Sequence, residues 1–140
     1  MKARHSVGSR LIVIAALYLM AALVLGCDMG VTGDHSLFSV HSHLGLLGWT
    51  TMALTGIVYL VLPACGSIVL ARVHFWLHNL GLPLMMVAIT VLTRWGDTRV
   101  QPAIGLGSLL VVLALLAFTV NVILNGRAIA IAERPVGVRS

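Results

Sequence analysis

The chain has 140 residues, of which 59% are hydrophobic and only 9% are charged. A soluble domain carries roughly 25% charged residues, because its surface must be covered by groups that water accepts. This composition excludes a soluble globular protein and leaves lipid as the solvent for most of the surface. The net charge of +5 is spread singly between apolar stretches, which is typical of membrane topology signals and not of a nucleic-acid-binding patch.

Four apolar stretches account for most of the chain. Each has roughly the 17–25 residues that a helix needs to cross a bilayer, and none alternates as the strands of a membrane barrel do. Backbone groups in lipid must be hydrogen-bonded within the protein, so long unalternating stretches favour helices. The sequence therefore predicts an all-α fold, a single integral membrane four-helix bundle over residues 1–140, with spans at about 11–27, 39–62, 73–93 and 103–124.

Basic residues flank these spans unequally. Two of them, Arg94 and Arg99, fall between the third and fourth spans. The other seven lie before the first span, between the second and third, or after the fourth: Lys2, Arg4, Arg10, Arg72, Arg127, Arg134 and Arg139. Because an excess of Lys and Arg marks the cytoplasmic side, we expect both termini in the cytoplasm. This predicts a multi-pass protein of the bacterial inner (cytoplasmic) membrane.

The first 27 residues allow a second interpretation. A basic start, an apolar run and the segment Val24–Cys27 imitate a bacterial lipoprotein signal, whose cysteine is acylated after cleavage. Leu25 is bulky for a position where small residues are usual, so a first membrane helix that ends near Gly26 is favoured. Cys27 and Cys65 then fall in loops on opposite membrane faces, which excludes a disulfide between them.

Six histidines in so apolar a chain are informative, since ionisable groups inside membrane spans are costly and usually functional. His5 lies in the basic tail and is assigned no role, and His35 lies in an outer loop where we expect it to be solvated. His41 and His43 stand in the first turns of the second span. Residues two apart on a helix point roughly 160° away from each other. These two histidines therefore cannot ligate one ion together, but they can serve two sites on opposite faces.

The helix face below His41 carries several small residues, and its members are Gly45, Gly48, Met52, Thr55, Gly56 and Tyr59. Small residues leave room for a flat ligand, or for another helix to approach closely. Two interpretations stay open: a ligand pocket, or helix packing in which the histidines form hydrogen bonds at the interface.

The third span carries a second pair, His74 and His78, which we expect near its cytoplasmic end. A spacing of four places both imidazoles on one helix face, which suits a single metal ion such as copper or zinc. No carboxylate or thiol lies in the same helix to complete a site. Packing or interfacial hydrogen bonding is therefore the favoured alternative.

The second span resembles a known segment, through Phe38–Trp49 (FSVHSHLGLLGW) followed by Gly56, Tyr59 and Pro63. It is similar to the tenth helix of the catalytic subunit of haem–copper oxidases, closest to the C-family (cbb-type) enzymes and the related nitric-oxide reductases. In that family an H-x-H pair binds two haems on opposite helix faces, the first histidine the high-spin haem and the second the low-spin haem. The segment His74–Trp76 likewise resembles the H-F-W that opens the eleventh helix. The chain thus resembles the last of three four-helix arcs.

This resemblance implies a b-type haem on His41 or His43, with Gly45 and Gly48 in the pocket wall. It also implies electron transfer, or binding of a diatomic gas such as NO or O₂, in a respiratory or nitrogen-oxide context. An electron-donor protein or a quinone is the further partner that electron transfer would require.

The family also holds haem propionates with adjacent basic residues in the outer loop between its last two helices. Arg94 and Arg99 occupy the corresponding loop here and are the candidates for that role, although four residues separate them. The alternative is that they are ordinary loop charges, one of them balanced by Asp97.

The sequence also departs from the family. The family's copper centre needs a histidine on the sixth helix and two adjacent histidines on the seventh, and no His-His pair exists in this sequence. A stand-alone haem–copper centre is therefore not expected, and whether the chain is an enzyme stays open. The competing hypothesis is a small membrane protein that binds or transports copper or zinc, or an accessory subunit of a larger oxidase.

A four-helix unit can supply the missing wall of a haem pocket by self-association, and closed cyclic symmetry is the usual solution. We expect a homotrimer, with a homodimer as the competing form, and haem between protomers. His74 and His78 are expected near the opposite face of a hydrocarbon core about 30 Å thick. They would then be too far away to share an iron with His41 or His43.

Overall fold

The computed structural model describes residues 6–66 and 68–132, with side chains for residues 6–66 and 68–126. Its elements in chain order are α1 (Val7–Thr32), α2 (Phe38–His43), the π-helical stretch η1 (Leu44–Thr51), α3 (Met52–Val61), α4 (Pro63–Gly66), α5 (Val69–Trp95), the 3-10 turn η2 (Thr98–Val100) and α6 (Gln101–Ala132). The elements α2, η1 and α3 follow one another without a break and form one span. All elements of the described residues are helical, which confirms the predicted all-α fold.

Four helices are long and apolar enough to cross a membrane: Val7–Thr32, Phe38–Val61, Val69–Trp95 and Thr98–Gly126. They confirm the four predicted spans, although α1 and α5 begin earlier than predicted, at Val7 and Val69. Helix α1 also continues past the predicted end at residue 27 as far as Thr32. Cys27 therefore lies within a helix and not in a loop, which corrects the prediction. Hydropathy marks where the apolar run ends, whereas the backbone hydrogen bonds continue through polar Asp28.

Local sequence explains how the long helices start and stop. The side chain of Ser6 accepts a hydrogen bond of 3.2 Å from the backbone N–H of Ser9 and caps the start of α1. Helices α1 and α5 each end at a glycine in the left-handed conformation, Gly33 at φ 71° and Gly96 at φ 66°. Glycine has no Cβ to penalise this conformation. The turns after α1 and α5 are therefore set by the local sequence.

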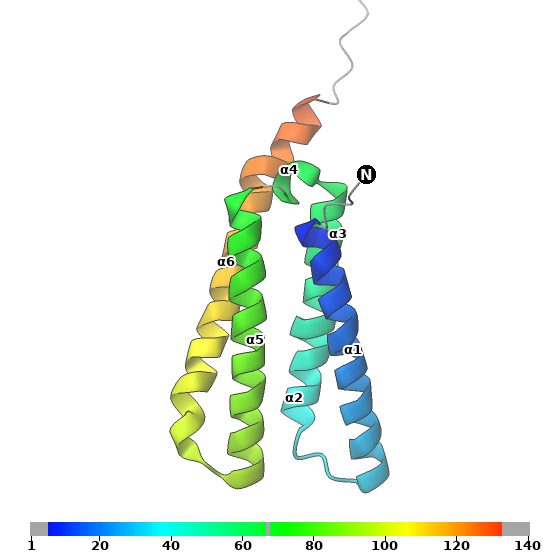
Figure 1. Ribbon diagram of the computed structural model, residues 1–140, viewed down its shortest axis with the longest axis vertical. Coiled ribbons are helices and arrows are strands. Elements are labelled where there is room, and N and C mark those ends of the chain that lie inside the picture. Colours follow the sequence, from blue (N-terminus) through cyan, green and yellow to red (C-terminus); the bar gives the residue numbers. More distant parts are fainter. Residues whose placement is uncertain (1–5, 67, 133–140) are drawn as a thin grey trace, which may run out of the picture.

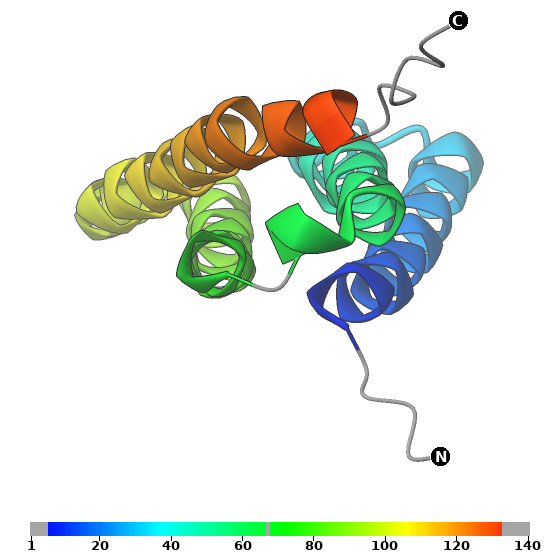
Figure 2. The same cartoon turned by 90° about the horizontal axis from the view of Figure 1, so that it is seen from above.

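The spans pack as two antiparallel hairpins. Helix α1 packs along α2, η1 and α3, and α5 packs along α6 (Figure 1). Seen from above, the two pairs lie side by side with the short helix α4 between them (Figure 2). The start of α1, helix α4 and the end of α6 share one end of the bundle, here called the terminal end. The turns after α1 and α5 lie at the other, called the hairpin end (Figure 1).

The surface of the bundle is unlike that of a soluble protein. Three of the fully buried side chains are polar: His74, His78 and Asn121. Large apolar side chains instead cover the outside, and many expose more than half of their surface, among them Val13, Leu17, Leu106 and Val112. Such a surface is unstable in water and is matched to hydrocarbon. The four apolar helices therefore fit a multi-pass protein whose surface contacts a lipid bilayer.

Two glycine pairs set how closely the helices of each hairpin approach. A Cβ atom on Gly8 of α1 would lie 2.6 Å from the carbonyl oxygen of Gly56 in α3. In the second hairpin, a Cβ atom on Gly107 would lie 2.7 Å from the carbonyl oxygen of Gly81. Only hydrogen fits at these four positions, as in small-residue packing between membrane helices. Gly56, on the small-residue face below His41, is thus used for packing within the chain.

The second span contains an eight-residue π-helical stretch, η1, directly after the two histidines. The hydroxyls of Thr50 and Thr51 donate hydrogen bonds to the carbonyls five residues earlier, those of Gly45 and Leu46, at 3.1 and 2.8 Å. A π-helical stretch changes the angular step per residue, so residues on either side of it no longer share the face that a regular α-helix predicts. Such stretches inside α-helices are frequent at functional sites.

Several residues used in the sequence analysis lie outside the described residues: Lys2, Arg4, His5, Arg134 and Arg139. Of Arg127 only the backbone is described. Among the described arginines, Arg10 and Arg72 lie near the terminal end, at the starts of α1 and α5, and Arg94 and Arg99 lie near the hairpin end. The orientation in the membrane therefore stays a prediction from the whole sequence.

Candidate functional site: four membrane histidines

His41 points from α2 into the first hairpin. Its Nδ1 lies 2.9 Å from the carbonyl oxygen of Ala22 in α1. The ring lies over Gly26, where an added Cβ would be only 2.9 Å from the ring carbon Cε1. Gly26 thus makes the space in which the His41 ring sits against α1.

His43 has different surroundings, although it is two residues away. Its Nδ1 lies 2.7 Å from the carbonyl oxygen of Ser39, one turn earlier in the same helix. The half-buried side chain thus makes its hydrogen bond on α2 itself, whereas that of His41 reaches α1. The two rings therefore serve separate surroundings, as the spacing predicts.

His74 and His78 of α5 are completely buried, with 0% of each residue exposed. Nδ1 of His74 lies 3.1 Å from the hydroxyl oxygen of Tyr59, and Nε2 of His78 lies 3.1 Å from the carbonyl oxygen of Leu47. The two ring centroids are 5.7 Å apart and nearly perpendicular, at 84°. Among the described residues, Nε2 of His74 and Nδ1 of His78 have no hydrogen-bond partner.

His74 and His78 lie further from the start of their helix than the predicted span at 73–93 implies. Leu47 is the tenth residue of its 24-residue span, which places it roughly 14 Å below the hairpin end at 1.5 Å per residue. His78, whose ring reaches Leu47, therefore lies near the middle of the bundle, and His74 lies one turn nearer the terminal end. The reason is that α5 begins at Val69, so the pair stands one to three turns inside the helix.

A polar chain continues from this pair toward the terminal end. The hydroxyl of Tyr59 hydrogen-bonds the side chain of Asn121 as well as His74. The Asn121 amide in turn donates to the carbonyl oxygen of Cys65 at 3.0 Å. The ring of Phe118 covers His74 at a centroid distance of 5.4 Å. Contacts from α3, α4 and α6 therefore fix the His74 ring.

The two loop arginines, which the resemblance assigns to propionates, are paired with carboxylates of this chain. Arg94 lies 2.7 Å from Asp34 and joins the turns of the two hairpins. Arg99 lies 2.9 Å from Asp97, the balancing charge that the sequence suggests. Hydrogen bonds from Ser36 and then Arg94 lower the pKa of Asp34. Arg94 uses only Nη1 in its pair and keeps donors for a second carboxylate, whereas Arg99 donates both Nε and Nη2 to Asp97.

The two glycines assigned to a pocket wall differ in their surroundings. An added Cβ on Gly48 would lie 2.7 Å from Cβ and Cγ of Tyr18 in α1, so this position is filled from within the chain. No described atom lies within 4 Å of an added Cβ on Gly45. Gly45 is therefore the one of the two that an external group can approach.

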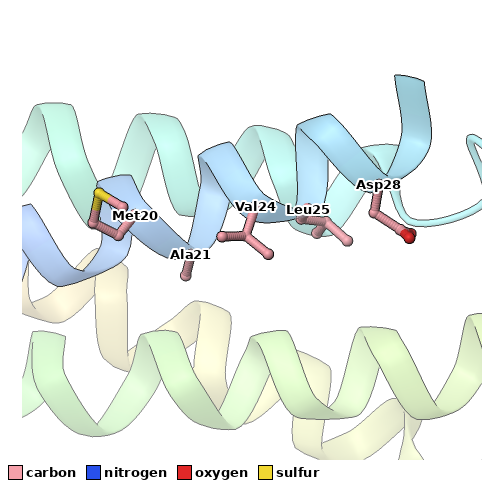
Figure 3. A pocket seen from close by; sticks show the side chains of 5 residues that line it. All are labelled: Met20, Ala21, Val24, Leu25 and Asp28. Carbon is pink, nitrogen blue, oxygen red and sulfur yellow. The ribbon is translucent and has the colours of Figure 1, made fainter. Parts of the chain in front are cut away.

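The bundle also has an open groove of about 540 Å³ along α1, near the hairpin end. It is lined by Met20, Ala21, Val24, Leu25 and Asp28, whose side chains project toward α5 in Figure 3. None of these lining residues is a histidine or a thiol. The groove therefore offers apolar surface to a lipid chain, but no iron ligand.

No group of three or more His, Cys, Asp or Glu side chains able to hold a metal ion occurs within the described part of the chain. Comparison of the chain with family models, with curated proteins and with solved structures found no match. The haem–copper resemblance consequently rests on the residues of the second and third spans alone.

Several partners at these sites were not predicted from the sequence, and two of them involve residues that the sequence analysis had singled out. Tyr59 was part of the quoted motif but was not expected to bind His74, and Asp34 was not expected to pair with Arg94. The only sequence signal for Tyr59 is a hydroxyl at the end of an apolar span, which needs a partner when buried. Nothing local indicates which partner it takes.

Proposed function

We propose that this chain is a membrane b-type haem-binding protein that serves electron transfer or diatomic gas binding in a respiratory or nitrogen-oxide context. The observation that supports it most directly is the backbone carbonyl oxygen beside Nδ1 of both His41 and His43. A carbonyl oxygen can only accept a hydrogen bond, so Nδ1 of each neutral ring must carry the proton and donate it. The lone pair then lies on Nε2, the nitrogen available to iron.

This arrangement is the usual support of a metal-binding imidazole. A ligating histidine almost always donates its other ring N–H to a carbonyl, carboxylate or water, which fixes the ring and raises the basicity of the ligating nitrogen. Both histidines of the H-x-H motif have such a carbonyl, His41 from α1 and His43 from its own helix. The two rings are therefore oriented before any ligand arrives. A bound haem supplies reversible one-electron chemistry or an open position for a gas.

We propose further that haem lies between copies of the chain. His41 and His43 lie in separate surroundings, so one copy does not bring both to a single iron. A second histidine at the same depth must come from a neighbouring protomer or from the loop residue His35. Gly45, which is open to an external group, suits such an interface. A closed ring completes every site equally, and we propose a homotrimer.

The resemblance to haem–copper oxidases supports this proposal, and its departures limit it. The sequence has no His-His pair for the family's copper centre, so no oxygen-reducing haem–copper reaction is proposed. The unequal basic flanks support an inner-membrane protein with the terminal end in the cytoplasm. His41 and His43 then lie toward the periplasmic side.

The absorption spectrum of the purified full-length protein tests the proposal. We expect a Soret band in the wild type, and a lost or shifted band in His41→Ala or His43→Ala, because each variant removes a fixed Nε2 ligand. His35→Ala and His5→Ala are the matched controls. His35→Ala should change the spectrum only if the loop supplies the other axial ligand. His5→Ala should leave the spectrum unchanged.

Two results contradict the proposal. A wild-type protein that neither retains haem on purification nor takes it up on addition would exclude haem binding, and metal analysis would then test the competing copper or zinc hypothesis. Unchanged spectra in both single variants would move the haem site away from the H-x-H motif.

A further inference from the structure

The His74–His78 pair, the two buried histidines of α5, is not used by the proposed haem site. Both rings are 0% exposed, and each has one ring nitrogen bonded and the other without a partner among the described residues. A buried polar atom with no partner loses its hydration without compensation. Two such atoms on neighbouring rings, in the middle of an apolar bundle, require an explanation.

In each ring, the hydrogen bond at one nitrogen determines whether the other nitrogen carries a proton or a lone pair. The Leu47 carbonyl only accepts, so Nε2 of His78 carries the proton and Nδ1 holds a lone pair. The Tyr59 hydroxyl oxygen can accept from Nδ1 of His74, and the same hydroxyl group bonds the Asn121 side chain. In that arrangement Nε2 of His74 also holds a lone pair. Both unpartnered nitrogens are then neutral donors to a cation.

We propose that His74 and His78 bind one cuprous ion, through Nε2 of His74 and Nδ1 of His78. The pair has the metal-site pattern in which each ligating imidazole donates its other N–H to a fixed oxygen. A spacing of four on one helix and a centroid distance of 5.7 Å bring both rings within reach of one ion. The inference is independent of the haem proposed at His41 and His43.

The number of ligands selects the ion. The described residues offer no third His, Cys, Asp or Glu beside the pair, whereas zinc is held by about four ligands and cupric ion prefers a tetragonal set. Cuprous ion is stable with as few as two ligands, so two imidazoles suffice. Its single charge is also less costly than a double one in an apolar interior.

The test is an anaerobic titration of the full-length protein with Cu(I) against a colorimetric cuprous chelator. The background carries Cys27→Ser and Cys65→Ser, because free thiols also bind Cu(I). We expect one Cu(I) per chain, and at least a tenfold loss of affinity in His74→Ala and in His78→Ala. Tyr59→Phe should retain the ion with 10–100-fold lower affinity, as for a lost supporting hydrogen bond. His5→Ala is the matched control, since His5 is assigned no role, and it should bind Cu(I) like the parent.

A second measurement needs no histidine variant and keeps the test valid if a variant misfolds. In ¹⁵N NMR of the same protein, the probe Ag(I) should shift one Nε2 and one Nδ1 resonance, from two different histidines. Equal binding by the parent and a folded His74→Ala/His78→Ala variant would overturn the proposal. So would no binding by the parent, or shifts of two Nε2 resonances only.

Discussion

At the scale of single residues, the four membrane histidines are each held by an oxygen atom of this chain. His41, His43 and His78 use backbone carbonyls, and His74 uses the Tyr59 hydroxyl. A carbonyl acceptor selects the protonated ring nitrogen, and therefore also the nitrogen left for a ligand. The chemistry of each histidine is thus decided by its neighbour and not by the residue type alone.

Gly26 provides the residue-scale prediction, because it makes the space occupied by the His41 ring. In Gly26→Ala the new Cβ would lie 2.9 Å from the ring carbon Cε1, so the ring must move and its bond to Ala22 must lengthen. We expect a shifted Soret band or weaker haem retention, measured by absorption of the purified protein.

Gly30→Ala is the matched control, since it lies one turn further along α1 with no described atom within 4 Å of an added Cβ. It should leave the spectrum unchanged, and the helix gains up to about 1 kcal/mol from the better helix former. Identical spectra for Gly26→Ala and the wild type would show that His41 is not an iron ligand.

At the scale of elements, the small-residue face below His41 runs through the π-helical stretch η1 and is not one uniform surface. A regular α-helix predicts that Gly45 and Gly48 share a face. In the structure Gly48 packs on Tyr18 of α1, whereas Gly45 has no described atom near its missing side chain. One glycine therefore serves the hairpin, and the other is left for a partner.

The two positions give opposite predictions for leucine. Gly48→Leu overpacks the contact with Tyr18 and should destabilise the hairpin by about 1–3 kcal/mol, measured as a lower thermal midpoint in detergent. Gly45→Leu should keep that midpoint but release haem and dissociate the oligomer together, measured by absorption and by size-exclusion with light scattering.

The Gly45 result bears directly on the shared haem site. A Gly45→Leu protein that keeps both its oligomeric state and its haem would exclude this face as the interface. A monomeric wild type that holds low-spin haem with His35 mutated would exclude a site shared between protomers.

At the scale of the whole molecule, two tightly packed hairpins are joined by few but specific contacts. The ring of His78 reaches Leu47 across the hairpins near the middle of the bundle, and Tyr59 meets His74 one turn nearer the terminal end. Asn121 reaches Cys65 at the terminal end, and Arg94 pairs with Asp34 at the hairpin turns. The polar contacts between the hairpins thus occur at several depths, which fixes their register although most of the surface is apolar.

Orientation is the prediction that belongs to this scale. Seven basic residues flank the terminal end and two lie at the hairpin end, so reporter fusions at Ser140 and near Gly66 should indicate the cytoplasm. Fusions near Thr32 and Asp97 should indicate the periplasm, measured as paired alkaline phosphatase and fluorescent protein activities. A periplasmic C-terminus would contradict the four-span orientation and would move His41 and His43 to the cytoplasmic side.

The sequence by itself determined that lipid surrounds most of the surface, that the fold is helical and that there are four spans. An apolar run of this length has only one way to satisfy its backbone in lipid, so composition decides the secondary structure. It also determined that His41 and His43 diverge, because that follows from helix geometry within a regular turn.

Only the tertiary structure decided the partners. Tyr59 meets His74, and Leu47 meets His78, because the hairpins dock at a particular depth, and a hydrogen bond between segments far apart in sequence leaves no local pattern. The different surroundings of Gly45 and Gly48 likewise depend on the tertiary structure, because they follow from where Tyr18 of α1 packs. Hydropathy indicates which helices contact lipid, but the depth and rotation of one helix against another depend on side-chain packing.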